Sequence, residues 1–99
     1  MLIPKDLIIQ AKEKLGDRAA YIIAQDLQLQ KFDEKNLKAL CYWHDEETPS
    51  LVWNHKDNYY KCFGCGRVYS IIDHYMNFYN LTYLGAVEKL FDESGIKYS

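Results

Sequence analysis

Four metal-ligand residues in two close pairs constrain this chain more than any other feature of its sequence. Two residues separate Cys41 from His44, two separate Cys62 from Cys65, and seventeen lie between the pairs. Each short spacing lets one tight turn direct two side chains at a single ion, and the longer gap lets a hairpin bring the turns together. The pattern uses every cysteine of the chain and predicts a tetrahedral zinc site.

The donor set favours a structural zinc. Three thiolates and one imidazole fill the four positions of a tetrahedral ion and leave none for water or substrate. Binding of this kind contributes on the order of 10 kcal/mol to the folding of a small domain. An alternative interpretation takes Cys62 and Cys65 as a redox pair or a disulfide, with Cys41 left over.

An enzymatic alternative arises from His44 and Glu46 followed by the Cys-x-x-Cys pair, which superficially match the signature of zinc deaminases. That signature has a proline before its first cysteine, where this chain has Lys61, and leaves one metal position for water. Cys41 would fill that position here. We therefore expect no catalytic residue in this chain, and we interpret Glu46 as a solvated turn residue.

Length and composition are typical of a small folded domain. The chain has 99 residues, of which 48% are hydrophobic and nine are tyrosine, whereas disordered chains are poor in aromatic residues. No apolar run reaches membrane length, and we expect a single intracellular domain over residues 1–99. Because the net charge is −2, any contact with nucleic acid must come from a local patch.

Two helices are predicted before the metal motif, within residues 4–27. The first begins near Pro4 and ends at Gly16, and Asp17 can cap the second. Over residues 27–32, leucine and glutamine alternate ahead of Lys31 and Phe32, which predicts a strand leading into the first metal turn.

The metal motif is expected on a small antiparallel sheet, a zinc ribbon over about residues 28–69. Strands begin at Leu51 and Tyr59, and a polar turn separates them. Two closing helices over residues 70–95 follow, the first capped by Ser70. The predicted fold class is α+β, with one zinc ribbon flanked by N-terminal and C-terminal helices.

Residues 41–66 resemble a known family and read CYWHDEETPSLVWNHKDNYYKCFGCG. They are similar to the Cys-His-Cys-Cys zinc-binding domain at the N-terminus of bacterial and phage DNA primases, whose pattern runs C-P-x-H-x-[DE]-x-T-P-S and later C-F-G-C-G. Both ligand pairs, the turn at 48–50 and the knuckle at 62–66 match this pattern. Residues 71–73 and 83–90 are similar to the two closing helices of the family.

The resemblance implies a zinc ribbon that contacts single-stranded DNA template and helps to select where a primer starts, while a separate domain polymerises. The implied cofactor is one structural Zn²⁺. The implied partners are the template, the primase catalytic domain and the replicative helicase. The implied location is the cytoplasm of a bacterial cell, for a protein of bacterial or phage origin. Nothing in the chain supplies the carboxylate cluster that would hold magnesium for nucleotidyl transfer.

Aromatic and basic residues interleave on the predicted ribbon, and single strands are bound by stacking on rings and by pairing with phosphates. Strand alternation puts Tyr59 and Lys61 on one face and Tyr60 with Cys62 on the other. Asp57 is included among the template-contact candidates because it corresponds, with its neighbours, to template-reading positions of related phage primases. Core packing is an alternative role for a tryptophan. The template-contact candidates are Trp53, His55, Lys56, Asp57, Tyr59, Tyr60, Lys61 and Arg67.

The chain departs from the family pattern near the predicted binding surface. Glu47 stands where the family has a basic residue, Tyr42 where it has a proline, and residues 67–69 where it has a glycine-rich stretch. An acidic chain also suits a second function, a ribbon that docks on a primase catalytic domain, a helicase or another replication factor without touching DNA. A third is an inhibitor that mimics a primase domain.

Overall fold

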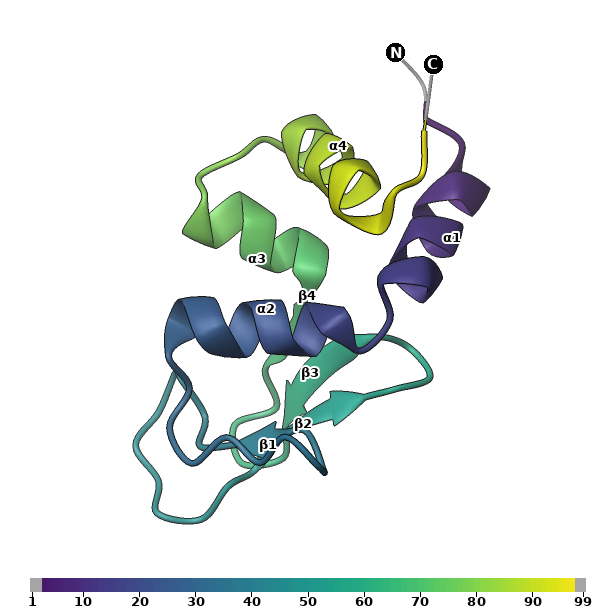
Figure 1. Ribbon diagram of the computed structural model, residues 1–99. Coiled ribbons are helices and arrows are strands. Elements are labelled where there is room, and N and C mark those ends of the chain that lie inside the picture. Colours follow the sequence, from purple (N-terminus) through teal and green to yellow (C-terminus); the bar gives the residue numbers. More distant parts are fainter. Residues whose placement is uncertain (1–2, 98–99) are drawn as a thin grey trace.

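A computed structural model describes residues 3–97 and shows the predicted α+β class (Figure 1). Four helices accompany a four-stranded antiparallel sheet with the strand order β1-β2-β3-β4. Among the described residues, no helix is both long and apolar enough to cross a membrane. The elements are α1 Lys5–Leu15, α2 Arg18–Leu27, β1 Lys38–Ala39, β2 Leu51–Asn54, β3 Tyr59–Cys62, β4 Val68–Ser70, α3 Ile71–Phe78 and α4 Tyr83–Ser94.

The first two helices form where their periodicity predicts them, but Asp17 does not cap α2. Asp17 lies at the N-cap position, and its side chain makes no capping hydrogen bond. Its carboxylate instead accepts hydrogen bonds from the Trp53 indole at 3.1 Å and from His55 Nδ1 at 2.9 Å. The aspartate therefore ties the start of α2 to the end of β2, which is a tertiary role that the local sequence does not reveal.

The strand predicted over residues 27–32 is wrong. Leu27 ends α2, and Gln28 adopts the left-handed conformation, where its amide donates to carbonyls of the last helical turn. Beyond it, Lys31 has φ of 54°, and this segment forms no ladder with β1: the Leu40 amide donates to the Gln30 carbonyl, and an isolated bridge joins Asp33 to Lys38. The alternating pattern therefore arose from a helix end followed by an irregular loop with one buried side chain, Leu29.

The sheet has one buried face and one open face. Trp53, Tyr60 and Tyr69 lie on the buried face, together with the cysteine that ends β3. The Tyr60 hydroxyl donates to the carbonyl of Ala20 at 2.9 Å, which joins the sheet to α2. On the open face, the ladder places one residue of each strand in a row, because directly paired residues project to the same side. This row is Lys38, Val52, Lys61 and Val68.

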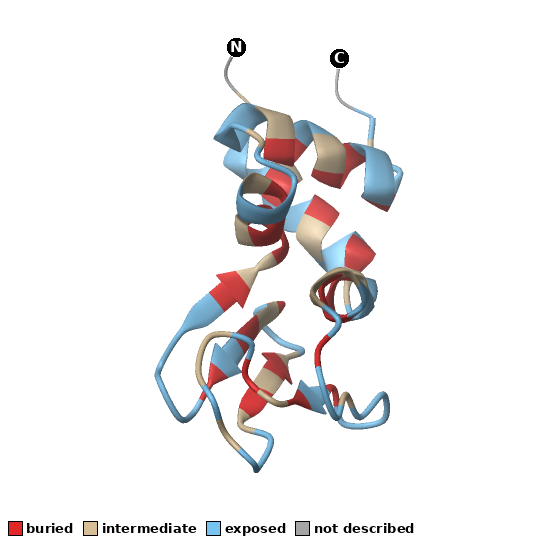
Figure 2. Ribbon diagram, turned by 90° about the vertical axis from the view of Figure 1, so that its left-hand side faces the viewer, coloured by how far each residue is buried: buried red, intermediate tan, exposed pale blue. Residues whose placement is uncertain are grey.

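The closing helices pack at the opposite end of the molecule from the metal-ligand loops, and α4 lies against α1 and α3 (Figures 1 and 2). A capping box fixes the junction of β4 and α3: Ser70 accepts from the Asp73 amide, and the Asp73 carboxylate accepts from the Ser70 amide. Nearby, the fully buried His74 lies between the Tyr69 hydroxyl and the Asp26 carboxylate, so α3 is also tied to α2.

Candidate metal centre

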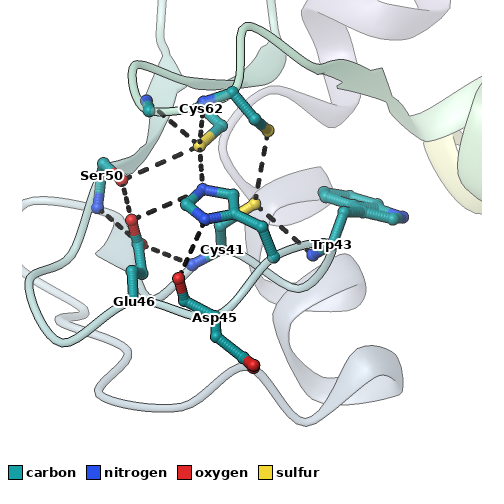
Figure 3. A network of polar contacts seen from close by, with 9 residues as sticks. Cys41, Trp43, Asp45, Glu46, Ser50 and Cys62 are labelled. Carbon is teal, nitrogen blue, oxygen red and sulfur yellow. Dashed lines mark hydrogen bonds and ion pairs between the residues drawn. The ribbon is translucent and has the colours of Figure 1, made fainter.

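The structure brings together the four predicted ligand residues. Cys41 follows β1, His44 lies in the next loop, Cys62 ends β3 and Cys65 lies in the turn before β4. Their donor atoms all lie within 4.8 Å of one another. The two thiols Cys41 and Cys65 are 3.9 Å apart, and His44 Nε2 is 3.2 Å from Cys62 Sγ (Figure 3).

These separations fit one zinc ion. With a Zn–S bond of about 2.3 Å, neighbouring sulfurs of a regular tetrahedron lie about 3.8 Å apart, close to the observed distance between the Cys41 and Cys65 thiols. Thiolate and imidazole ligands in this number are those of a closed structural site. The group is thus suited to holding one zinc ion, and the chemistry that zinc supplies here is cross-linking of two loops.

Backbone amides of the two knuckle turns point at sulfur. The amides of Gly64 and Cys65 lie 3.3 and 3.4 Å from Cys62 Sγ, and the Trp43 amide lies 3.4 Å from Cys41 Sγ. Burial raises the pKa of the Cys62 thiol, but the hydrogen bonds from the Cys65 amide and from the His44 ring outweigh burial and lower that pKa to about 6. The turn thus favours the thiolate, which is the form that binds metal.

The pKa of the Cys41 thiol is shifted in the opposite direction. Burial is the main reason that the pKa of its thiol rises to about 11, against the smaller effect of the Trp43 amide. Because a thiolate is needed for coordination, this thiol must release a proton when the metal binds.

The His44 ring is oriented by its own loop. Nδ1 lies 3.2 Å from the carbonyl of Asp45, so in the neutral ring Nδ1–H donates to that carbonyl and Nε2 is left to face the cysteines. A carbonyl partner of this kind holds a ligating imidazole in one tautomer and one orientation. The hydrogen bond with Cys62 raises the pKa of His44 in the absence of metal.

Glu46 is a functional residue that the sequence reasoning interpreted differently. Its Oε2 accepts from the amide of Cys41 at 2.8 Å and from the amide of Ser50 at 3.1 Å, and its Oε1 accepts from the Ser50 hydroxyl (Figure 3). The same hydroxyl lies 3.8 Å from Cys62 Sγ. These hydrogen bonds, led by that from the Ser50 hydroxyl, lower the pKa of the Glu46 carboxyl.

Glu46 is therefore a structural brace and not a solvated turn residue. Its side chain is 12% exposed, and its bonds connect the first ligand pair to the loop that contacts the second. The signal that could have identified it was the acidic position of the C-P-x-H-x-[DE]-x-T-P-S pattern, which Glu46 occupies. The placement gives no support to the acid–base role of a deaminase glutamate, because the carboxylate is occupied by the backbone of its own loop.

Gly64 stands at a close approach between the two knuckles. A Cβ atom at this position would lie 3.0 Å from Nε2 of His44 and 3.2 Å from the Ser50 hydroxyl oxygen, so His44 or Ser50 would have to shift slightly to admit a side chain. Gly66, by contrast, has open space around it and a φ of +81°, a backbone conformation that favours glycine. The two glycines of the second knuckle therefore serve different purposes.

The structure separates the template-contact candidates into two groups. Trp53 and Tyr60 are 2% and 0% exposed and pack edge to face against each other, so neither ring presents a surface to a ligand. Tyr59 is half-buried on the open face beside the exposed Lys61. The remaining candidates are exposed and lie in the turn before β3 or in the knuckle: His55, Lys56, Asp57 and Arg67.

Tyr42 and residues 67–69, which depart from the family pattern, meet at one corner of the sheet. The Tyr42 and Trp43 rings meet edge to face at 5.5 Å between centroids, and Trp43 lies 4.7 Å from the Tyr69 ring. The Arg67 guanidinium lies 5.0 Å from the centre of the Trp43 ring. Trp43, like the exposed Phe63 of the second knuckle, was not among the sequence candidates, although each stands between two ligands of a pair.

Comparisons with known proteins identify relatives of the whole chain. Residues 4–99 match the family described as CHC2 zinc finger. The DNA primase of Buchnera aphidicola subsp. Baizongia pistaciae is 37% identical over 91 residues, which cover 90% of this chain and 15% of that protein. The DNA primase of Clostridium acetobutylicum is 32% identical over 96 residues, covering 97% of this chain and 16% of that protein.

A third relative, the DNA primase of Streptomyces coelicolor, is 36% identical over 75 residues, covering 76% of this chain and 12% of that protein. The chain thus spans a small part of each relative's length. The match over nearly all of its residues agrees with the Cys-His-Cys-Cys group found in the structure. The chain belongs to the CHC2 zinc finger family and is a zinc-finger domain of the DNA primase type.

Proposed function

We propose that this chain is the template-contacting part of a DNA primase and binds single-stranded DNA on the open face of its sheet to help select primer start sites. The observation that carries the proposal is the row of Lys38, Val52, Lys61 and Val68 across that face, in a chain whose relatives are DNA primases. In this proposal, residues 1–99 act as one domain in the bacterial cytoplasm, and polymerisation belongs to a separate domain.

The open face carries the two kinds of group that a single strand needs. Lys61 lies 5.5 Å from the centre of the exposed Phe63 ring, and Tyr59 stands two residues earlier on the same face. Among residues 3–97, Lys61 forms no ion pair with a carboxylate, so its ammonium is available to a phosphate. Rings for bases and cations for phosphates support template binding.

A second candidate function is protein docking, and a different surface favours it. Large apolar side chains are exposed along α3 and α4, on the helical side of the molecule. Exposed apolar patches often mark protein interfaces, and a primase catalytic domain or a helicase would be the partner. The residues concerned are Phe78, Tyr79, Tyr83 and Leu84.

Fluorescence anisotropy of a labelled single-stranded oligonucleotide tests the proposal. We expect zinc-loaded protein to bind with an affinity that falls as salt rises, because each neutralised phosphate releases counterions. Lys61→Ala should weaken binding and reduce the salt slope by about 0.7. Lys5→Ala, which removes a lysine from the start of α1 far from the sheet, should leave both unchanged.

Two outcomes would contradict template binding. The first is no binding at low salt by protein that holds zinc and melts cooperatively, which would favour the docking function. The second is equal loss of affinity in the Lys61 and Lys5 variants, which would indicate attraction by overall charge and not by the open face.

A further inference from the structure

We propose that Tyr42, Trp43 and Arg67 form a binding subsite for a single nucleobase and its phosphate, at the corner of the sheet beside β4. The inference rests on the proposed function, because it names where one nucleotide of the bound strand lies. It concerns residues outside the open face of the sheet, and it can fail while the open face still binds DNA.

The aromatic rings at this corner pack against one another, and two of them remain accessible. Tyr42 is 55% exposed, and its ring meets Trp43 edge to face. The Trp43 ring is half-buried, rests against the buried Tyr69 and points away from the donor cluster (Figure 3). Because the Tyr69 ring packs against it, the Trp43 ring is held in place before any ligand arrives, which lowers the entropy cost of binding.

Arg67 supplies a planar cation at the same place. Its guanidinium lies over the Trp43 ring, and among the described residues it forms no ion pair with a carboxylate. A guanidinium can stack on a base and also pair with a phosphate, two properties that a lysine ammonium does not combine. An exposed arginine that is held by a ring and not by an acid is therefore suited to a nucleotide.

A hollow of about 380 Å³ lies beside these residues, between the first knuckle, β4 and the end of α3. Its volume falls within the range of small-ligand pockets, about 300–1,000 Å³. Phe78 adds a further ring to its wall, and the exposed Asn77 adds an amide, a group that hydrogen-bonds base edges. Asp73 also lines the hollow, and its carboxylate accepts from the Ser70 amide and hydroxyl, so the lining offers a base apolar planes with a few polar groups.

The hollow continues the proposed DNA surface. Val68 ends the open-face row that begins at Lys38, and the same Val68 lines the hollow. A strand that crosses the sheet along this row therefore reaches Tyr42 and Arg67 at the edge of β4. This continuity, together with an arginine that has no carboxylate partner within residues 3–97, favours a nucleotide over a protein segment as the occupant.

Tryptophan emission and oligonucleotide affinity test the subsite with the zinc-loaded protein of residues 1–99. The chain has two tryptophans, and only Trp43 is accessible, since Trp53 is buried. We expect an oligothymidylate of about twelve nucleotides to quench the Trp43 emission on stacking. Trp43→Phe should abolish this quenching and keep most of the affinity, because the ring stays in place.

Two matched pairs of variants separate stacking from charge. Tyr42→Ala should weaken binding about five- to hundredfold, whereas Tyr42→Phe should remain near the wild type, since stacking contributes energies of that size. Arg67→Ala should reduce the salt slope by about 0.7, and Arg67→Lys should keep the slope but lose affinity. Zinc content and the melting temperature of each variant confirm that it is folded.

The outcomes distinguish this inference from the proposed function. If Lys61→Ala weakens binding while Tyr42→Ala stays within twofold of the wild type and no quenching occurs, the subsite is refuted and the open face stands. Equal affinity for oligonucleotides with and without bases would also refute it. If the wild-type protein binds no oligonucleotide at all, the proposed function fails and the subsite fails with it.

Discussion

At the scale of single residues, the metal centre depends on Glu46, a carboxylate that is not one of the four predicted ligands. The Glu46 carboxylate accepts hydrogen bonds from the amides of Cys41 and Ser50 and from the Ser50 hydroxyl. All three partners are donors, and an ionised acceptor strengthens each of these bonds. Glu46→Gln keeps one oxygen for the two amides but puts an NH2 group against the Ser50 hydroxyl, so the negative charge and one of the two acceptor oxygens are lost. We predict a 10–100-fold loss of zinc affinity, the usual effect of removing a group that orients ligands.

Competition with a chromophoric chelator measures that loss, and Glu47→Gln is the matched control. Glu47 is the exposed neighbour, and in the structure only its backbone carbonyl accepts a hydrogen bond, from Lys31. The same substitution there should leave zinc affinity within about twofold. Equal affinities for the two variants would show that Glu46 does not hold the loop.

His74 gives the protein a residue-scale dependence on pH. Burial lowers its pKa, against the opposing hydrogen bond with Asp26. The unfolded chain gains a proton on this residue near pH 6.5, whereas the folded chain gains it only at lower pH. Stability from His74 is therefore complete above the unfolded pKa and is lost as pH falls toward the folded one.

The prediction is that His74→Gln loses less stability than the wild type between pH 7.5 and pH 5.5, although it is less stable at pH 7.5. Urea unfolding at each pH, with zinc in fixed excess, supplies the free energies of unfolding. Zinc ligands titrate in both proteins, so the difference between the two curves isolates His74. Parallel curves would contradict the assignment.

At the scale of elements, the junction between β4 and α3 is held by the capping box of Ser70 and Asp73. Ser70→Ala removes the hydroxyl that accepts from the Asp73 amide, and we predict a loss of about 1 kcal/mol in the free energy of unfolding. Ser70→Thr keeps the hydroxyl and should lower the free energy of unfolding by only a few tenths of a kcal/mol. Equal urea midpoints for the alanine variant and the wild type would show that the cap is not needed.

The sequence was informative about elements whose signals are local. Ser70 predicts the start of α3 because a cap involves residues three apart, and the metal turns follow from ligand spacing alone. The strand expected over residues 27–32 failed because a helix end and a loop can also alternate apolar and polar residues. Asp17 failed as a cap because its partners, Trp53 and His55, lie far along the chain and compete for the carboxylate.

At the scale of the whole molecule, apolar packing stabilises one end, and the metal-ligand residues lie at the other. The helical end has an apolar core in which α4 packs on α1 and α3, and α2 joins it to the sheet through the Tyr60 hydroxyl and Asp17 (Figure 2). The loop end carries the donor cluster. The sequence alone predicted the helices of one end and the metal turns of the other. It could not show that Trp53 and Tyr60 are buried, because the alternation of side chains along a strand does not indicate which face of the sheet packs against a helix.

We therefore predict that the zinc cross-link holds the loop end together. Cys65→Ser removes the most exposed ligand of the set and should lose zinc and the cooperative melt of the sheet, because metal binding supplies on the order of 10 kcal/mol of folding free energy. Ser94→Ala, a change of similar size at the end of α4, should retain both.

Native mass spectrometry combined with thermal melting tests the role of zinc most directly. We expect one zinc per chain in the wild type, none in Cys65→Ser, and a loss of cooperative unfolding that accompanies the loss of zinc. A Cys65→Ser protein that keeps one zinc and melts cooperatively, or a wild-type protein that folds cooperatively without zinc, would contradict this role.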